Sequence, residues 1–311
     1  MIFVFLIFLV FAAIVGGIIL LILRAQSKEQ VDAFLARARG TIALRLGVLL
    51  VLVLVSQIPI EIMMDLLNER QRYAAQVTNQ VTDANGRRQA VVGPYLVIPY
   101  SYQIKQKETR VVDGKDKQID VFRTVTTQAV FLPDQLKMDF DLAPDMLAKS
   151  IYKVLTYRAV MKAQGQFAAP DFSTFSTQPQ TIHYDKAYLS FSLSDMRTLE
   201  SGAQISIGAF KDLALRPGGK LTANGFHALL PLKSAPQAKD LGFDMTLAFR
   251  GSESLKFAPL GLENDFQVAS TWPSRKFIGE VRPQVSEASE QGFTANWRPS
   301  GLARSYSQAW T

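Results

Sequence analysis

The chain has 311 residues, of which 48% are hydrophobic and 20% charged, so it is too apolar for an intrinsically disordered protein. It contains no cysteine and only two histidines, which excludes a disulfide scaffold, a thiol nucleophile, zinc bound by thiolates and a three-histidine metal site. The 34 Lys and Arg residues outnumber the 27 Asp and Glu residues, which gives a net charge of +7.

The first 23 residues carry no charged side chain. As a helix they would be about 34 Å long, which is enough to cross the hydrocarbon core of a bilayer. The alternative, a cleaved signal peptide, would have basic residues ahead of the apolar stretch. Here the first basic residue, Arg24, follows it. The sequence therefore favours a retained transmembrane helix over residues 1–23.

Residues 46–66 predict a second transmembrane helix, because residues 46–60 are uncharged and hydrophobic on all sides. The connector between the two spans, residues 24–45, has five basic and two acidic residues, whereas the flank after the second span begins with acidic residues. The positive-inside rule then places the connector in the cytoplasm. The chain after about residue 67 is expected in the periplasm, beyond a bacterial inner membrane.

This topology limits the partners. We expect the lipid bilayer as one partner, and envelope components or other inner-membrane proteins as partners of the exported surface. The basic excess is spread over the exported part without any block of five like charges. A solvated surface of mixed charge explains it better than binding of nucleic acid, which is not expected as a partner.

Residues 67–84 are polar with apolar residues at helical spacing, which predicts that the second helix continues outward as a stalk. Asn85-Gly86 should end this helix, because Asn-Gly favours a tight turn with positive φ.

Residues 85–311 change to the period of two that is typical of β-strands. In the clearest strand, residues 242–251, Phe243, Met245, Leu247 and Phe249 fall on one face. Other β-rich stretches occupy residues 91–102, 119–132, 137–142, 151–167, 187–194, 203–210 and 266–272. The pattern predicts a large antiparallel β-sandwich-like periplasmic domain, so the chain is expected to be a membrane-anchored, mainly β protein. One short helix is expected at residues 194–200, with Ser194 as its N-cap.

Few residues suggest catalysis. His227 is a candidate general base, with Asp195 or Asp244 as a candidate acid, in an alternative interpretation as a membrane-anchored periplasmic hydrolase that acts on envelope glycan or lipid. A single histidine in a β domain is more often a packed or surface residue. His183 and Asp185 would share a strand face, but two side chains are too few for a metal site. We therefore assign no catalytic, cofactor-binding or metal-binding residue and expect no cofactor.

Several stretches of the chain occur in an order that is familiar from one bacterial family. They are IPIEIMMDLLNERQ (58–71), VVGPYLVIPY (91–100), SIYKVLTYRAVMKAQGQF (150–167), AYLSFSLSDMRTLE (187–200), GFHALL (225–230), MTLAFRGSESLKFAPLG (245–261), TWPSRKFIGEVRP (271–283) and QGFTANWR (291–298). Through them the chain resembles the CreD family, inner-membrane proteins associated with cell-envelope integrity. The resemblance covers roughly residues 42–311.

The resemblance implies a non-enzymatic role in envelope integrity and homeostasis, under the control of a two-component system. It also implies a periplasmic β domain placed after one membrane span and followed by a bundle of further spans, so we expect this chain to be the N-terminal portion of a longer protein. Two features depart from the family pattern. Residues 1–23 add a span, and Ser274 follows Trp272-Pro273 where a histidine is expected, which argues against a metal site at this turn.

Overall fold

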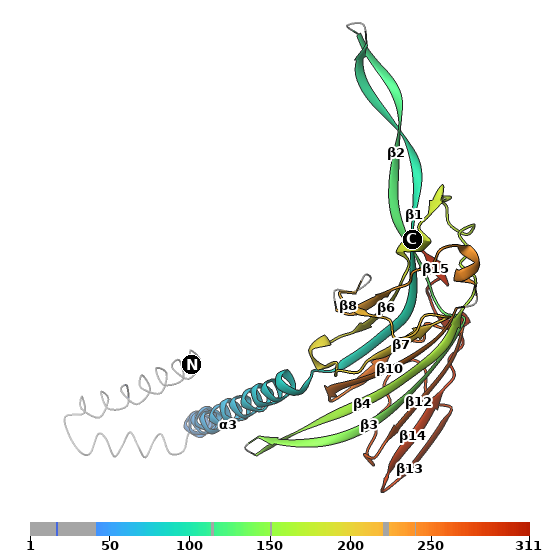
Figure 1. Ribbon diagram of the computed structural model, residues 1–311. Helices are drawn as coiled ribbons and strands as arrows, with labels where there is room; N and C mark the ends of the chain where they lie inside the picture. Colours follow the sequence, from blue (N-terminus) through green and yellow to red (C-terminus); the bar gives the residue numbers. More distant parts are fainter. Residues whose placement is uncertain (1–16, 18–41, 113–114, 150, 220–223, 240) are drawn as a thin grey trace, which may run out of the picture. The chain divides into compact units, whose positions relative to one another are not determined.

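The computed structural model describes residue 17 and residues 42–112, 115–149, 151–219, 224–239 and 241–311 (Figure 1). The predicted first membrane span, residues 1–23, lies outside the described residues except for residue 17, and so does most of the predicted connector at 24–45. The chain divides into two compact units, residues 1–76 and residues 77–311. We call the second unit the β domain.

Helix α3 (Ile42–Asn85) is continuous through the predicted second span and the predicted stalk. Among the helices formed by the described residues, none has both the length and the hydropathy that crossing a membrane requires. Within the β domain, the last turns of α3 bury Val77 and Val81. The helix ends at Asn85, and Gly86 follows with a φ of +103°, as the Asn-Gly pair predicts.

The β domain contains two sheets, so the prediction of a mainly β chain is confirmed. Sheet A has the strand order β15-β2-β1-β6-β9-β8, with β5 and β11 also paired to β1. Its strands are β1 (Gln89–Val112), β2 (Lys115–Phe131), β5 (Thr181–Ile182), β6 (Tyr188–Leu193), β8 (Leu215–Pro217), β9 (Phe226–Leu229), β11 (Leu255–Phe257) and β15 (Ala309–Trp310).

Sheet B has the order β13-β14-β12-β3-β4-β10-β7. Its strands are β3 (Gln135–Lys149), β4 (Tyr152–Phe167), β7 (Gln204–Ile207), β10 (Leu241–Ser252), β12 (Glu263–Ser270), β13 (Val285–Ser289) and β14 (Gly292–Trp297). Most strand pairs are antiparallel, as predicted, but the sheets are mixed, because β12 pairs with β3 in parallel and β11 pairs with β1 in parallel. Long stretches of chain separate the partners in both pairs, so no hairpin turn fixes their direction.

The two sheets share one hydrophobic core. Large side chains from both are almost completely buried in it, and Phe140 of β3 stacks on Phe257 of β11 with 5.4 Å between ring centroids. Burial alternates along β10 as predicted, with Phe243, Met245 and Leu247 buried. Burying these aromatic and aliphatic side chains supplies most of the driving force for folding of the β domain.

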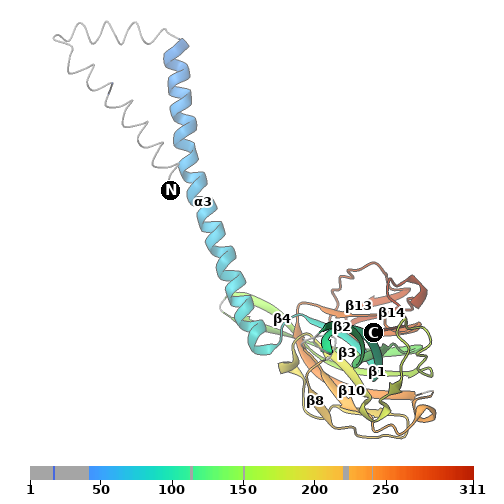
Figure 2. The ribbon, with the colours of Figure 1, turned by 90° about the horizontal axis from the view of Figure 1, so that it is seen from above.

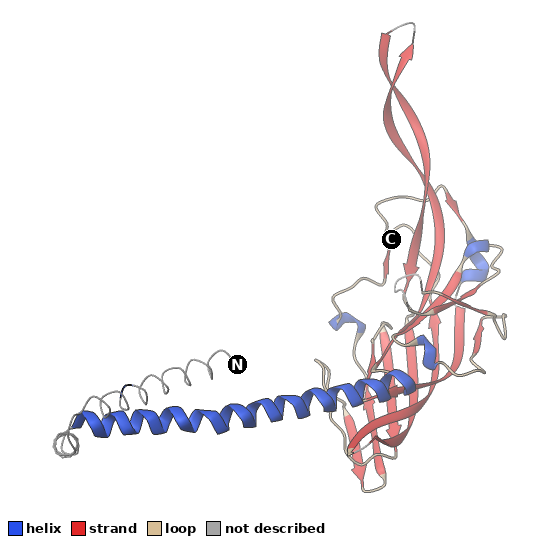
Figure 3. Cartoon of the chain, turned by 90° about the vertical axis from the view of Figure 1, so that its left-hand side faces the viewer, coloured by secondary structure: helices blue, strands red, loops and turns tan. Residues whose placement is uncertain are grey.

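A long hairpin projects from sheet A. Strands β1 and β2 stay paired from Leu96↔Phe131 to Val112↔Lys115, and beyond Tyr102 the hairpin leaves the rest of the sheet (Figure 3). Figure 2 views this hairpin along its length. At about 3.3 Å per residue, the part from residue 103 to residue 112 extends about 33 Å. We call residues 103–124 the arm.

The short helix expected at residues 194–200 is a single 3-10 turn, η2 (Met196–Thr198). Its cap is Asp195, whose carboxylate accepts a hydrogen bond from the backbone N–H of Arg197. The prediction of Ser194 as the N-cap was therefore wrong by one residue. Ser194 instead donates its hydroxyl to the carbonyl of Arg88 and accepts from the backbone N–H of Ala90, across the start of β1.

Candidate functional site

A network of polar side chains surrounds the point where α3 ends and β1 begins. Its centre is Gln89, the first residue of β1, which is only 1% exposed. The side-chain amide donates to the carbonyl oxygen of Arg250 at 2.7 Å and to the hydroxyl of Thr198 at 2.8 Å. Its oxygen accepts from the backbone N–H of Asp195 and lies 3.0 Å from the hydroxyl of Ser194. A buried amide with all these partners fixes the start of β1 against both η2 and β10.

Asp195 lies next to Gln89 and is 8% exposed. The guanidinium of Arg197 donates to its two oxygens at 2.9 and 2.8 Å, and the backbone N–H of Arg87 donates at 3.4 Å. The hydrogen bonds from Arg197 lower the pKa of the Asp195 carboxyl below its ordinary value, against the opposing effect of burial. Asp195 is therefore an ionised structural acceptor at neutral pH.

Glu200 forms the second charged part of the network. It accepts from Arg158 of β4 at 2.9 and 2.8 Å and from Arg250 of β10 at 3.3 Å. These contacts, first of all the hydrogen bonds from Arg158, lower the pKa of the Glu200 carboxyl. The two arginines are direct partners in the β4–β10 ladder, so one carboxylate bridges them and offsets part of their mutual repulsion.

The turn itself has no space for a side chain. A Cβ on Gly86 would lie 2.8 Å from the carbonyl oxygen of Arg250 and 2.8 Å from the methyl group of Thr198. Asp83, in the last turn of α3, forms an ion pair with Arg87 across this turn. We call the whole set the junction network; it comprises Asp83, Gly86, Arg87, Gln89, Arg158, Ser194, Asp195, Arg197, Thr198, Glu200 and Arg250.

The junction network unites three of the stretches that sequence analysis singled out separately. Arg158 comes from SIYKVLTYRAVMKAQGQF, Asp195 to Glu200 from SLSDMRTLE, and Arg250 from MTLAFRGSESLKFAPLG. Each stretch contains charged residues inside an otherwise apolar or alternating pattern. Sequence analysis quoted these stretches for their order along the chain, and only the register of β4 and β10 brings Arg158 and Arg250 together.

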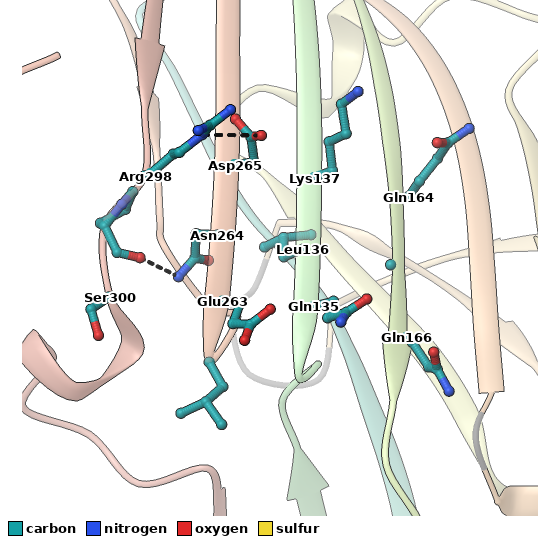
Figure 4. Close-up of a pocket in the computed structure, with 13 residues that line it drawn as sticks. Gln135, Leu136, Lys137, Gln164, Gln166, Glu263, Asn264, Asp265, Arg298 and Ser300 are labelled. Carbon is teal, nitrogen blue, oxygen red and sulfur yellow. Dashed lines mark hydrogen bonds and ion pairs between the residues drawn. The ribbon is translucent and has the colours of Figure 1, made fainter. Parts of the chain in front are cut away.

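A second candidate is an open hollow of about 680 Å³ on sheet B, lined by β3, β4, β12 and the chain after β14 (Figure 4). Asp265, Lys137 and Gln164 follow one another in register across three strands. Arg298 forms an ion pair with Asp265 at 3.4 Å, and Lys137 lies 3.6 Å from Asp139. The lining therefore offers both charges and side-chain amides to a polar ligand.

One wall of this hollow is fixed by Asn264, which is buried. Its amide donates to the carbonyl oxygen of Pro299 (Figure 4). The amide also donates to the carbonyl oxygen of Gly261, and its oxygen accepts from the N–H of Gly261. None of the described residues that line the hollow is a histidine.

The residues of the hydrolase alternative lie in separate parts of the β domain. His227 is on β9 of sheet A, where its Nδ1 contacts the carbonyl oxygen of Gly218 at 2.8 Å and its ring packs against Tyr188. Asp244 is on β10 of sheet B and accepts from Gln164 at 2.7 Å. Asp195 belongs to the junction network. The hydrogen bonds of the described residues connect His227 to neither acid.

His183 has a partner that sequence reasoning did not find. Its Nε2 lies 2.7 Å from the hydroxyl of Ser101, which also lies 2.9 Å from the hydroxyl of Thr126. The three side chains come from β1, β2 and the segment after β5, so no local pattern could reveal them. Within the part of the chain that the structure describes, no group of three His, Asp or Glu side chains could bind a metal ion.

Comparison with known proteins gives consistent results. The family model described as "Inner membrane protein CreD" matches residues 41–311. The inner membrane protein CreD of Escherichia coli (strain K12) is 25% identical over 252 residues, which cover 81% of this chain and 54% of that protein. The chain thus spans about half the length of this curated relative. No solved structure matches it.

Proposed function

The chain belongs to the CreD family of inner membrane proteins, and from that premise we propose that it supports cell-envelope integrity through a periplasmic β domain that does not catalyse a reaction. In this proposal two N-terminal transmembrane helices anchor the chain. The β domain binds or senses an envelope component, for which the mixed-charge hollow on sheet B is the candidate binding surface.

The junction network is the observation that carries this proposal. Its charged side chains are engaged with one another, and arginines keep both Asp195 and Glu200 ionised. Carboxylates in this state fix geometry and are poor proton donors. The network clamps the first residue of β1 to η2 and β10 immediately after the end of α3. Through these contacts, a conformational change in the β domain can move the end of α3.

Complementation in a bacterium that carries this gene tests the role. Deletion should increase sensitivity to detergents and wall-active antibiotics, and the intact gene should restore resistance. Glu200→Gln should restore it poorly at equal protein abundance, because the clamp is weakened. Asp120→Asn is the matched control: it removes a carboxylate that pairs with Lys105 on the arm, away from the network, and should complement fully.

The same assay tests the absence of catalysis. His227→Ala and Asp244→Asn should each complement as well as the intact gene. Loss of resistance in the His227→Ala strain, with normal protein abundance, would contradict the non-catalytic proposal and favour the hydrolase. A deletion strain that keeps full resistance, after any paralogous gene is also removed, would contradict the envelope role itself.

Cysteine labelling tests the proposed topology, because the chain has no native cysteine. Phe122 on the arm is 63% exposed, so Phe122→Cys should react with a membrane-impermeant thiol reagent on spheroplasts. Ser27→Cys, in the predicted cytoplasmic connector, should react only after the membrane is permeabilised. The reverse labelling pattern would overturn the periplasmic assignment.

A further inference from the structure

The loop between β12 and β13, residues 271–284, exposes large aliphatic side chains to solvent. Ile278 is 85% exposed and Val281 is 47% exposed, and Val285, which begins β13, is 56% exposed. Single exposed aliphatic residues are common on protein surfaces, but three within eight residues of one segment are typical of a contact surface.

The loop is fastened to the sheet by an aromatic contact. The ring of Phe277 packs against Trp297 at 5.2 Å and against Phe293 at 6.0 Å, in edge-to-face geometry with both. Arg275 donates to the hydroxyl of Ser286 and lies 6.0 Å from the centre of the Phe277 ring. Ile278 therefore extends from an anchored base, directly after a packed aromatic residue.

Basic residues flank the aliphatic ones. Arg275, Lys276 and Arg282 are all exposed, and Glu280 is the one acidic residue between positions 271 and 284. The ion pairs found among the described residues include none with Lys276 or Arg282. Exposed aliphatic side chains surrounded by basic ones match the interface of an anionic bilayer, where the aliphatic groups enter the headgroup region and the cations meet phosphates.

The strand register places this loop at one particular end of the β domain. Ser270, the last residue of β12, pairs with Leu142 of β3. Across the next two strands of sheet B, Leu142 pairs with Ala159 of β4, and Ala159 pairs with Phe249 of β10. The residue after Phe249 is Arg250, whose carbonyl oxygen lies so close to Gly86 that a Cβ there would be only 2.8 Å away. The loop therefore leaves sheet B at the end where the chain enters the β domain from α3.

We propose that residues 275–282 are a membrane-contact loop that docks on an anionic phospholipid surface, with Ile278 and Val281 inserted and Arg275, Lys276 and Arg282 at the headgroups. The charges of the loop favour a membrane over a protein partner, because three exposed basic side chains flank the exposed aliphatic ones and the chain belongs to a family of inner membrane proteins. This inference rests on family membership and not on the envelope role, so either can fail without the other.

The test uses the full chain in lipid nanodiscs. Ile278→Cys is labelled with an environment-sensitive fluorophore, and nanodiscs contain either phosphatidylglycerol with phosphatidylcholine or phosphatidylcholine alone, with lipids brominated near the headgroup as quenchers. Ser201→Cys, an exposed position before β7, is the matched control. We expect the label at residue 278 to be quenched in anionic nanodiscs, much less in neutral ones, and the label at residue 201 to be unaffected.

Charge removal completes the test. Replacing Arg275, Lys276 and Arg282 by Gln should reduce quenching at residue 278, with each replacement lowering the docked population about fivefold. These side chains are exposed, so the variant should melt like the parent protein. Absence of quenching in both lipids, or equal quenching in both, would overturn the proposal. Protection of residue 278 in native membrane vesicles but not in nanodiscs would also overturn it, by indicating a protein partner.

Discussion

Arg158 and Arg250 lie directly opposite each other on β4 and β10, and Glu200 bonds to both. Two like charges at facing positions of an antiparallel pair are unfavourable on their own. The carboxylate that relieves this repulsion comes from the segment after η2, which is not part of either strand. A pair of charges within sheet B thus holds the η2 segment beside the start of β1.

Glu200→Gln removes the charge that offsets the two arginines. We expect the free energy of unfolding to fall by about 1 kcal/mol, a modest change because both arginines are half exposed and water screens the pair. Denaturant unfolding of the purified chain measures it. The double variant Arg158→Gln/Glu200→Gln should be closer to the parent than the single variant, since it also removes one of the repelling charges. Equal stability of parent and single variant would contradict the prediction.

Acid should weaken the junction network. The folded-state pKa values of Asp195 and Glu200 are below the ordinary values of 3.8 and 4.5, because arginines donate hydrogen bonds to them. A carboxyl group whose pKa is lowered by folding stabilises the folded state at pH values above its ordinary pKa. This stabilisation is lost as the pH falls through the folded-state pKa. The melting temperature of the parent should therefore fall more steeply below about pH 4.5 than that of Asp195→Asn/Glu200→Gln. Parallel melting curves across this range would count against the network's role in stability.

Gly86→Ala should be strongly destabilising. The substitution combines a φ of +103° with a Cβ placed 2.8 Å from both the Arg250 carbonyl oxygen and the Thr198 methyl group. We expect a loss of about 2–4 kcal/mol in the free energy of unfolding. Gly202→Ala is the matched control: its φ is +95°, but nothing lies within 4 Å of its Cβ, so it carries the backbone strain alone. Equal effects of the two substitutions would show that close packing at Gly86 is unimportant.

Gln89→Met tests the buried amide at the centre of the network. Methionine has a similar length, but it leaves the Arg250 carbonyl oxygen and the Asp195 N–H without this partner. The expected loss is about 2–3 kcal/mol, from polar groups left unsatisfied in a buried position. The same substitution at Gln103, which is exposed on the arm, should leave the unfolding curve unchanged. A stable Gln89→Met protein would mean that water replaces the lost bonds.

The arm should be dispensable for folding. None of its described side chains is buried, and the core residues of β1 and β2 lie before residue 103 and after residue 124. Replacing residues 103–124 by Asn-Gly should keep a single cooperative transition, with a melting temperature within about 4 °C of the parent. Tyr100→Ala, at a fully buried position just before the arm, should instead lower stability by about 3–5 kcal/mol. Loss of cooperative unfolding in the arm deletion would contradict the prediction that the arm is dispensable for folding.

Local patterns in the sequence determined the strands and the end of the helix. Alternation at Phe243, Met245 and Leu247 predicts the buried face of β10, because successive side chains of a strand point to opposite sides. Asn85-Gly86 predicts the end of α3, because glycine adopts positive φ without a steric penalty. These features depend on residues close together in the chain, and they are visible without coordinates.

The tertiary structure alone decided how those elements combine. The parallel pairing of β12 with β3 and the meeting of Arg158, Glu200 and Arg250 join segments that are far apart in sequence. Most of the arm was also missed, since the polar residues 103–118 have no alternating pattern that marks a strand with a buried face. Register between distant strands follows from packing of the whole core, and periodicity within one segment contains no information about its partner.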